Sequence, residues 1–253
     1  MSSEYRVTIV GAGRLGTALA RSLRAAGVDV TGPLGRRDVD ALRGAEVVLL
    51  CVPDAEIANA AHVAAGLAPP DALLGHCSGA TTLEPLAPRE RFSLHPLLAV
   101  TESTDGFRGA SGAVAGSTPR ALGVATWIAG RLGMHTFAVA DADRPLYHAA
   151  ASVASNYLVT LTWVAERLAA IGGVPRGPLL AMAARAVDQA AALGPRAALT
   201  GPIVRGDEAT VARQRAAIAD RAAELLPLWD ALADATRALA RQEPKHDLET
   251  LSR

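Results

Sequence analysis

The segment Val7–Ala20 constrains the fold of this chain more than any other part of the sequence. The apolar run Val7–Val10 predicts a strand, and after a glycine-rich turn the alanine- and leucine-rich residues have helical spacing. A G-x-G-x-x-G turn between a strand and a helix indicates a dinucleotide-binding domain, because the free N–H groups at the helix start favour phosphate. The alternative is a related domain that has lost its ligand. The residues expected to contact the cofactor are Gly11, Ala12, Gly13, Arg14, Leu15 and Gly16.

The residues after the second predicted strand, Val28–Leu34, bear on the choice of dinucleotide. NAD-binding domains usually carry a carboxylate at this place to bond the ribose 2′-hydroxyl. Here Gly35 is followed by Arg36 and Arg37, and two guanidinium groups suit a 2′-phosphate. We therefore predict NADP as the cofactor. The alternatives are a solvated arginine pair and a carboxylate role for Asp38, which favours NAD.

Strands and helices alternate through the N-terminal half. Further strands are predicted at Glu46–Val52, Leu73–His76, Phe92–Leu94, Gly112–Ala115 and Met134–Val139, with a helix at Thr118–Leu132. Continuous apolar runs are typical of buried parallel strands, so we expect an α/β fold with a doubly wound, mostly parallel sheet. The turn Val52-Pro53-Asp54 falls at the carboxyl edge of this sheet, where we expect all three residues to contact the cofactor and Asp54 to cap the next helix.

The sequence becomes helical after about residue 140. One long helix is predicted from the Asp141–Pro145 start to Ile171, and further helices follow at Leu179–Leu193, Glu208–Leu225 and Leu228–Arg241. We expect a dinucleotide-binding domain at 1–140, a helical substrate and dimerisation domain at 141–242, and a polar tail at 243–253.

Composition excludes several classes of partner. The 25 basic and 25 acidic residues balance to a net charge of +0, which does not favour nucleic acid or an anionic membrane. No apolar run is long enough to span a bilayer, and the first residues lack a signal-peptide layout, so we expect a cytoplasmic protein. Cys51 and Cys77 are expected to be reduced, buried thiols. The six histidines are scattered, and no metal site is predicted.

Polar residues on the long helix form the first candidate site. His148, Ser152, Asn156 and Thr160 recur at four-residue spacing and are expected to share one helix face. The stripe either bonds the neighbouring domain or lines a site, and we favour the site. Asn156 is expected to orient a substrate carbonyl or carboxylate, and His148 to donate a proton or bind an anion. The alternative for His148 is an interface histidine.

Two loops supply further candidates. Ser78 and His95 follow predicted strands, where Ser78 is expected to bind substrate and His95, with a near-neutral pKa, to act as a general acid. The alternative for His95 is a turn residue that bonds the backbone. In the loop Thr200–Asp207, Thr200 and Arg205 are expected to hold a substrate carboxylate. The alternative is a rigid connection with Asp207 as a helix cap.

These motifs resemble a family of bacterial Rossmann-like proteins with a C-terminal domain of unknown function, the DUF2520 type. The resemblance rests on Gly11–Ala20, Val52–Asp54, His76–Ala80, Ser93–Leu97, Asp143–Tyr157 and Thr200–Asp207. The family is similar to two-domain enzymes with a 6-phosphogluconate-dehydrogenase-like helical domain, among them ketopantoate and pyrroline-5-carboxylate reductases. The resemblance implies NADP-dependent reduction of a small carboxylate-bearing carbonyl or imine, in a homodimer held by the helical domains.

One position departs from that pattern. The hydroxyacid dehydrogenases and familiar ketopantoate reductases carry a lysine four residues before an asparagine on the interdomain helix. Asn156 matches the asparagine, but Ser152 stands at the lysine position, and the single lysine, Lys245, lies in the polar tail. The proton donor is then His148, His95, Tyr147 or a water molecule.

Three functions follow from these observations. The first is NADPH-dependent reduction of a small 2-oxo acid resembling ketopantoate. The second is imine reduction of the pyrroline-5-carboxylate kind, in which the substrate arrives already protonated. The third is a non-catalytic NADP(H)-binding sensor or scaffold.

Overall fold

The computed structural model describes residues 5–242. The chain divides into two compact units, residues 1–155 and residues 156–253, and each is described by itself. The predicted polar tail, including Lys245, lies outside the described residues. The strands of the first unit are β1 (Arg6–Val10), β2 (Asp29–Leu34), β3 (Val47–Leu50), β4 (Leu73–His76), β5 (Arg91–Leu97), β6 (Ser111–Gly116) and β7 (His135–Ala138). Its helices are α1 (Arg14–Ala25), α2 (Ile57–Leu67), α3 (Pro119–Arg131) and α4 (Arg144–Ser152).

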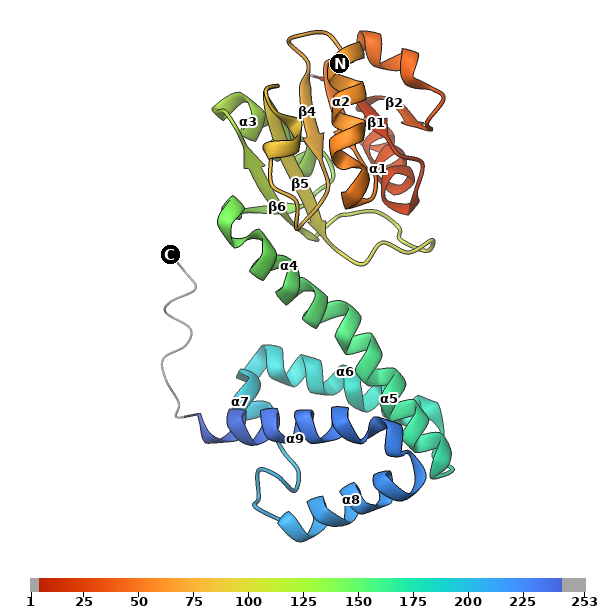
Figure 1. Ribbon diagram of the computed structural model, residues 1–253, viewed down its shortest axis with the longest axis vertical. Coiled ribbons are helices and arrows are strands. Elements are labelled where there is room, and N and C mark those ends of the chain that lie inside the picture. Colours follow the sequence, from red (N-terminus) through yellow and green to blue (C-terminus); the bar gives the residue numbers. More distant parts are fainter. Residues whose placement is uncertain (1–4, 243–253) are drawn as a thin grey trace. The chain divides into compact units, whose positions relative to one another are not determined.

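The sheet of the first unit is doubly wound and mostly parallel, as the sequence predicts. Its seven strands lie in the order β2-β1-β3-β4-β5-β6-β7 (Figure 1). Every neighbouring pair is parallel except β5 and β6, which run antiparallel. The carboxyl ends of β1, β3 and β4 therefore meet at one edge, which is where ligands bind in open sheets of this kind.

Successive strand residues enter two different cores, which explains the continuous apolar runs. Val47 and Leu49 of β3 pack in the core that contains α1 and α3, on one face of the sheet. Val48 and Leu50 pack in the core that contains α2, on the other face. Side chains alternate between the faces of a strand, so β3, which is covered on both sides, is apolar at every position.

Strand β5 is longer than predicted. The sequence predicts Phe92–Leu94, whereas the strand runs from Arg91 to Leu97 and includes Pro96. The neighbouring strand β4 ends where His76 pairs with Ser93, so the later residues of β5 are paired with β6 alone. A proline is tolerated where a strand has a free side.

The predicted capping role of Asp54 is wrong. Residues Asp54–Glu56 form a 3-10 turn that no side chain caps, and α2 begins only at Ile57. The tighter coil before the helix places Asp54 within the turn itself, so its side chain does not accept a bond from the helix start.

The predicted long helix is interrupted. A π-helical turn, Val153–Tyr157, separates α4 from α5 (Leu158–Ile171), and the boundary between the two units falls within it. A π turn inserts an extra residue into the helical repeat. The prediction of one unbroken helix is therefore wrong at residues 153–157.

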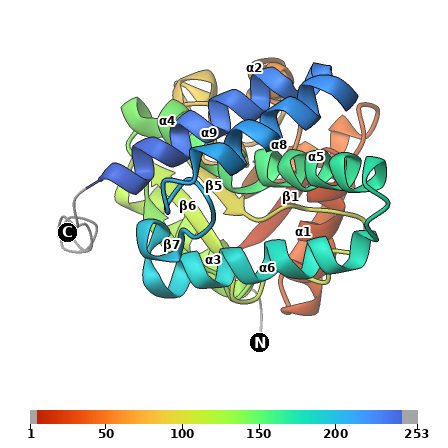
Figure 2. The ribbon, with the colours of Figure 1, turned by 90° about the horizontal axis from the view of Figure 1, so that it is seen from below.

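The second unit is helical. It contains α5 and then α6 (Arg176–Leu193), α7 (Pro195–Ala198), α8 (Glu208–Arg221) and α9 (Leu226–Arg241) (Figure 2). Its buried core is small and centres on Ile218, Ala222 and Leu225. The short helix α7 lies between the predicted helices Leu179–Leu193 and Glu208–Leu225, where the sequence predicts no helix. No helix within residues 5–242 is long and apolar enough to cross a membrane.

We expect Gly75→Ala to destabilise the first unit. The Gly75 backbone pairs with Phe92, and a Cβ atom at Gly75 would lie 2.3 Å from the Phe92 ring. Both residues are fully buried, so the ring has no free space to enter, and the cost is about 1–3 kcal/mol of unfolding free energy. The measurement is urea denaturation at neutral pH.

Gly66→Ala is the matched control for this change. Gly66 lies in α2, and a Cβ atom there would meet nothing within 4 Å. Because alanine is a better helix former than glycine, we expect stability to be unchanged or to rise by about 1 kcal/mol. Equal effects of the two substitutions would contradict the packing argument.

Candidate functional site

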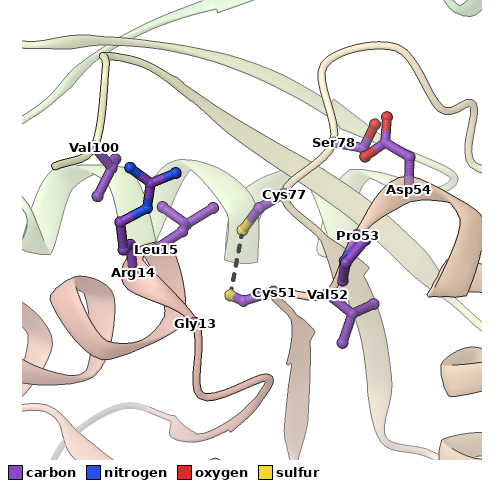
Figure 3. A pocket seen from close by; sticks show the side chains of 10 residues that line it. All are labelled: Gly13, Arg14, Leu15, Cys51, Val52, Pro53, Asp54, Cys77, Ser78 and Val100. Atoms are coloured by element: carbon purple, nitrogen blue, oxygen red, sulfur yellow. Dashed lines mark hydrogen bonds between the residues drawn. The ribbon is translucent and has the colours of Figure 1, made fainter.

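A groove runs over the glycine-rich turn at the carboxyl edge of the sheet. One half is a cavity of about 500 Å³ that extends from Gly11 to the end of β2. The other half is a cavity of about 320 Å³ that extends from Gly13 to Ser78 (Figure 3). The two halves share the residues Gly13, Cys51, Val52 and Pro53. Cavities of this size are typical of small-molecule and cofactor sites.

The surroundings of each glycine in the turn explain why a glycine occupies that position. Gly11 has a φ of 111°, which side chains rarely adopt, and a Cβ atom there would lie 2.4 Å from the carbonyl oxygen of Cys51. A Cβ atom on Gly16 would lie 2.0 Å from the carbonyl oxygen of Gly11. Gly13 precedes α1 and faces open space. The turn thus packs tightly at both ends and leaves room above its middle.

The start of α1 is suited to an anion. No side chain caps the helix, and no acidic residue lies in its first turn. Arg14 and Leu15 line one half of the groove and Ala12 the other. The free backbone N–H groups and the helix dipole therefore face a cavity without a competing carboxylate, an arrangement that binds phosphate.

Charged residues at the end of β2 line the larger half of the groove. Arg36 lines it and forms an ion pair with Glu56, whose carboxylate is 3.8 Å away. Arg37 is exposed and is absent from the lining. The Asp38 carboxylate accepts a hydrogen bond of 2.9 Å from the backbone N–H of Gly35. The structure thus brings one of the two predicted arginines to the groove, together with Glu56, which sequence reasoning missed.

The turn after β3 forms one wall. Val52 and Pro53 line both halves of the groove, and Asp54 lines the smaller half. The main chain there continues the β ladder, since the N–H of Cys51 donates to the carbonyl oxygen of Val10 at 2.7 Å. All three predicted residues of this turn lie where the sequence places them, at the sheet edge.

A buried arginine ties α4 to the sheet. Arg144 is only 1% exposed. Its Nε donates to the Asp141 carboxylate at 2.7 Å, and its Nη atoms donate to the Ser93 hydroxyl and to the carbonyl oxygen of Ser78. Asp141 in turn accepts from the backbone N–H of Leu83 at 3.3 Å. A buried guanidinium needs such partners, because an unpaired charge away from water is very costly.

This anchor brings three ring side chains together. The His95 Nδ1 atom is 2.7 Å from the Tyr147 hydroxyl, and the His95 and His148 rings are 6.1 Å apart. Gly79 lies between the imidazoles, since a Cβ atom there would be 2.8 Å from His95 and 2.9 Å from His148. We call His95, Tyr147 and His148 the ring cluster. It adjoins the groove through the neighbouring residue Ser78, which lines the groove.

Burial keeps His95 neutral. Desolvation, with the nearby His148 and Arg144, lowers the pKa of His95 to about 4. This value is below the near-neutral pKa that we expect from the sequence, and His95 belongs to β5, so the interpretation as a turn residue is wrong. Desolvation also raises the pKa of Tyr147. At neutral pH the pair therefore consists of an uncharged imidazole and a protonated phenol.

Ser78 is held within its own loop. Its hydroxyl lies 2.9 Å from the Thr81 hydroxyl and accepts from the backbone N–H groups of Ala80 and Thr81. His76 supports the same loop, with Nε2 3.0 Å from the carbonyl oxygen of Thr82 and Nδ1 accepting from the N–H of Ser78. Burial lowers the pKa of His76 to about 4. These bonds fix the loop that adjoins the ring cluster.

Of the other predicted residues, Ser152 belongs to the first unit and the rest belong to the second unit. Ser152, on α4, is half-buried. Asn156 is exposed, as is Thr160, whose hydroxyl donates to the Asn156 carbonyl oxygen within the helix. Thr200 and Arg205 are exposed in the segment before α8. Asp207 caps α8 by accepting from the N–H of Thr210 at 3.0 Å, so the capping role considered for it is confirmed.

Sequence reasoning missed the residues that support the ring cluster. Arg144 and Ser93 lie in two segments on which the family resemblance rests, but the sequence assigns a role to neither, because a buried arginine resembles a surface residue in an arginine-rich sequence. The proximity of Tyr147 to His95 also cannot be read from the sequence, because the two residues are 52 positions apart. A further signal is Gly79, a glycine three residues after a predicted strand. Within residues 5–242, no group of His, Cys, Asp or Glu side chains is arranged to hold a metal ion.

The fold and the groove define a class of protein: an α/β Rossmann-like domain joined to a helical C-terminal part. Within this class, residues 111–236 match the model of a family described as a domain of unknown function, DUF2520. This match confirms the resemblance to the DUF2520 type seen in its motifs.

Solved structures share the fold. A protein from Bacteroides fragilis, described as a candidate NADP oxidoreductase, is similar with a TM-score of 0.81 and 18% identity over 92% of this chain and 98% of that one. Protein TM1727 from Thermotoga maritima has a TM-score of 0.70 and 24% identity, with coverage of 94% and 100%. The pyrroline carboxylate reductase of Plasmodium falciparum, solved with NADP bound, has a TM-score of 0.61 and 10% identity, with coverage of 95% and 100%. No protein of curated function matches the sequence.

We expect the protein to lose stability as the pH falls from about 7 to about 5. The pKa values of His76 and His95 are about 4 in the folded protein and about 6.5 in an unfolded chain. Between these values the unfolded state binds more protons, so the free energy of unfolding decreases as the pH falls, by about 1–2 kcal/mol for each imidazole. Urea denaturation at the two pH values measures the difference.

Two variants isolate the contribution of His95. His95→Gln removes one titrating imidazole, so the pH-dependent loss should be roughly halved. His62→Gln removes an exposed histidine of α2 and should leave the loss unchanged. Identical pH dependence in the wild type and His95→Gln would show that His95 is not held neutral by burial.

Proposed function

We propose that this protein is an NADP(H)-dependent oxidoreductase that reduces the carbonyl of a small 2-oxo acid. The observation that carries the proposal is the junction of two features: a phosphate-suited groove over a G-x-G-x-x-G turn ends at Ser78, and the next residue, Gly79, lies against the ring cluster. A dinucleotide site beside a group that gives up a proton is the minimum requirement for reduction of a carbonyl. The similarity in fold to described NADP-binding oxidoreductases supports the same class of reaction.

The groove fits the cofactor on its own geometry. Its two halves, about 500 and 320 Å³, suit the two nucleotide parts, and the turn between them offers backbone N–H groups for the linking phosphates. Arg36 at the end of the larger half suits a 2′-phosphate, which favours NADP over NAD. When bound, the reduced cofactor supplies a hydride, and the chain must supply the proton that the substrate oxygen accepts.

Tyr147 is the residue that we assign as the proton donor. Its pKa is raised by burial, so the hydroxyl is protonated at neutral pH, and His95 orients it through a hydrogen bond of 2.7 Å. His95 itself has a pKa of about 4, so at neutral pH it is the neutral imidazole and not the imidazolium acid. Arg144, whose charge also bears on Tyr147, favours the phenolate that remains after proton transfer. This assignment explains how the chain works without the lysine of related reductases.

The roles of residues beyond the ring cluster remain predictions. His148 is assigned to hold the substrate anion or assist proton transfer, Asn156 to orient the carbonyl, and Arg205, with Thr200, to hold the carboxylate. Ser152 stands at the lysine position of related enzymes and is assigned to substrate binding with Ser78. Variants of Arg205 and Asn156 should raise the KM for the acid more than they change cofactor affinity.

Imine reduction is the second candidate. A cyclic imino acid arrives as an iminium ion and needs no proton from the protein, which suits a chain without the usual lysine. The fold of the Plasmodium falciparum pyrroline carboxylate reductase is similar. A non-catalytic NADP(H) sensor is the outcome if the dinucleotide binds and neither substrate class is turned over.

The assembly and location also remain proposals. Helices α5 and α6 have no buried residue, and large apolar side chains of the second unit are exposed, including Trp163, Met182 and Leu193. A partner copy that covers such side chains would add the apolar burial that the small core lacks, so we propose a homodimer. A cytoplasmic location and a small-molecule carboxylate substrate, without nucleic acid or membrane partners, complete the proposal.

We expect NADPH to bind at least about tenfold more tightly than NADH, a difference of about 1.4 kcal/mol. Arg36→Ala should remove the difference, because Arg36 is the arginine that lines the groove. Arg37→Ala is the matched control and should preserve it, since Arg37 lies outside the lining. Isothermal titration calorimetry gives both dissociation constants. Failure of both nucleotides to bind would reject the oxidoreductase proposal.

We expect Tyr147→Phe to lower kcat by about 10²- to 10⁴-fold while the NADPH dissociation constant stays unchanged. The assay is NADPH oxidation with a panel of 2-oxo acids and cyclic imino acids. Tyr157→Phe, at a tyrosine that is 60% exposed, is the matched control and should keep full activity.

The pH dependence separates the possible donors. Because the pKa of Tyr147 is raised above its usual value of about 10, wild-type kcat should fall only above that pH. A fall near pH 6.5 would indicate a histidine donor, and wild-type activity in Tyr147→Phe would exclude Tyr147. Selective turnover of imino acids by Tyr147→Phe would favour imine reduction.

A further inference from the structure

The two cysteines of the chain meet beneath the groove. Cys51 directly follows β3 and Cys77 directly follows β4, and their sulfur atoms are 3.7 Å apart (Figure 3). Cys51 is half-buried and Cys77 is buried. Both residues line the smaller half of the groove, and Cys51 also lines the larger half. Neither thiol has a role in the reduction proposed above.

The backbone geometry at this point is compatible with a disulfide. Leu50 pairs with His76 across the parallel strands, so Cys51 and Cys77 are the next opposed pair, and the N–H of Cys77 donates to the carbonyl oxygen of Leu50 at 3.1 Å. Neighbouring strands lie about 4.7–4.9 Å apart. This spacing is within the range of about 4.4–6.8 Å between the Cα atoms of bonded cysteines.

Cys51 is also in contact with the glycine turn. A Cβ atom on Gly16 would be 3.2 Å from the Cβ atom of Cys51, and one on Gly11 would be 2.4 Å from the Cys51 carbonyl oxygen. The glycine turn therefore packs against Cys51 without free space between them. A shift of the Cys51 side chain or backbone is transmitted to the residues that are assigned to the cofactor phosphates.

We propose that Cys51 and Cys77 form a reversible disulfide, and that this bond weakens dinucleotide binding. The proposal rests on the cofactor site of the proposed function. To form the bond, the sulfur atoms must approach from 3.7 Å to about 2.05 Å. Cys51 lines both halves of the groove, so its movement changes the lining of both. A bound dinucleotide in turn holds these residues in the arrangement of the reduced, dithiol protein.

The oxidant is hydrogen peroxide or another peroxide. The Cys51 thiolate attacks one peroxide oxygen, which breaks the O–O bond, forms a sulfenic acid and releases water after proton uptake. The Cys77 sulfur then attacks the Cys51 sulfur, and the sulfenic oxygen leaves as a second water with the Cys77 proton. The two thiols are oxidised by two electrons in total, and one peroxide is reduced to two water molecules.

The order of the two thiols follows from their surroundings. Cys51 is the more exposed sulfur and lines both halves of the groove, so peroxide reaches it first. A hydrogen bond to Cys51, together with burial, raises the pKa of Cys77, so that thiol stays protonated until the Cys51 sulfur becomes electrophilic. Excess dithiol reverses the bond by thiol–disulfide exchange.

The test uses the full-length protein treated with hydrogen peroxide. Intact mass spectrometry and peptide mapping should show a Cys51–Cys77 crosslink with the loss of two hydrogen atoms. Calorimetry should show an NADPH dissociation constant raised at least about tenfold and restored by dithiothreitol. Saturating NADPH, added before peroxide, should slow crosslink formation several-fold.

Two single variants are the controls. Cys51→Ser and Cys77→Ser each lack the crosslink, and peroxide should leave the NADPH affinity of each at the value measured before treatment. A peroxide effect that persists in both variants would assign it to other residues and reject the proposal. Reduced protein that binds NADPH but forms no crosslink, or a crosslink that leaves NADPH affinity unchanged, would also reject it. Reduced protein that binds no dinucleotide would instead overturn the proposed function.

Discussion

The arrangement of the candidate site depends on one buried positive charge. Arg144 reaches from the first residue of α4 to β5 and to the loop after β4, and its partners satisfy a guanidinium that is removed from water. This anchor, together with the hydrogen bond between Tyr147 and His95, fixes α4 on the sheet edge. Because Tyr147 and His148 are on the next turn of the same helix, the anchor also determines where the ring cluster lies relative to the groove.

The same charge affects the chemistry of its neighbours. Arg144 adds to the effect of burial in lowering the pKa values of His76 and His95. It acts in the opposite sense to burial on Tyr147, where a nearby cation favours the phenolate. His76 and His95 are therefore uncharged at neutral pH, although they lie close to the Arg144–Asp141 ion pair.

Much of the fold could be predicted from the sequence because the signals are local. The glycine turn, the apolar strands and the helix starts each depend on residues a few positions apart, and the sheet follows from their alternation. The errors have local causes as well. Proline favours the end of a strand, but Pro96 lies within β5 at a place where one side of the strand is free. Asp54 is a typical capping residue, but the helix that follows it begins only three residues later. A π turn follows α4 where the sequence predicts an unbroken helix, and no residue type between Val153 and Tyr157 indicates this turn.

The site was less predictable, since its contacts join distant segments. Ser78 can be placed at the sheet edge from the sequence because the end of β4 is predicted correctly, whereas His95 lies inside β5, beyond the predicted end of that strand. The pairing of His95 with Tyr147 and the burial of Arg144 depend on how α4 packs, which spacing alone does not determine. The uncharged state of His95 has the same origin, because desolvation is a property of the packed structure.

Gly79 is a sequence feature by which other chains with the same ring cluster can be recognised. Any side chain at this position would displace both imidazoles, so a chain that keeps the ring cluster must keep this glycine. The requirement links H-x-S-G at the end of β4 to R-x-x-Y-H at the start of α4, with His95 of β5 as the other contact of the glycine, although these segments are far apart in the sequence. Divergent sequences should therefore gain or lose the two segments together, and a chain with only one of them has given up this arrangement of rings.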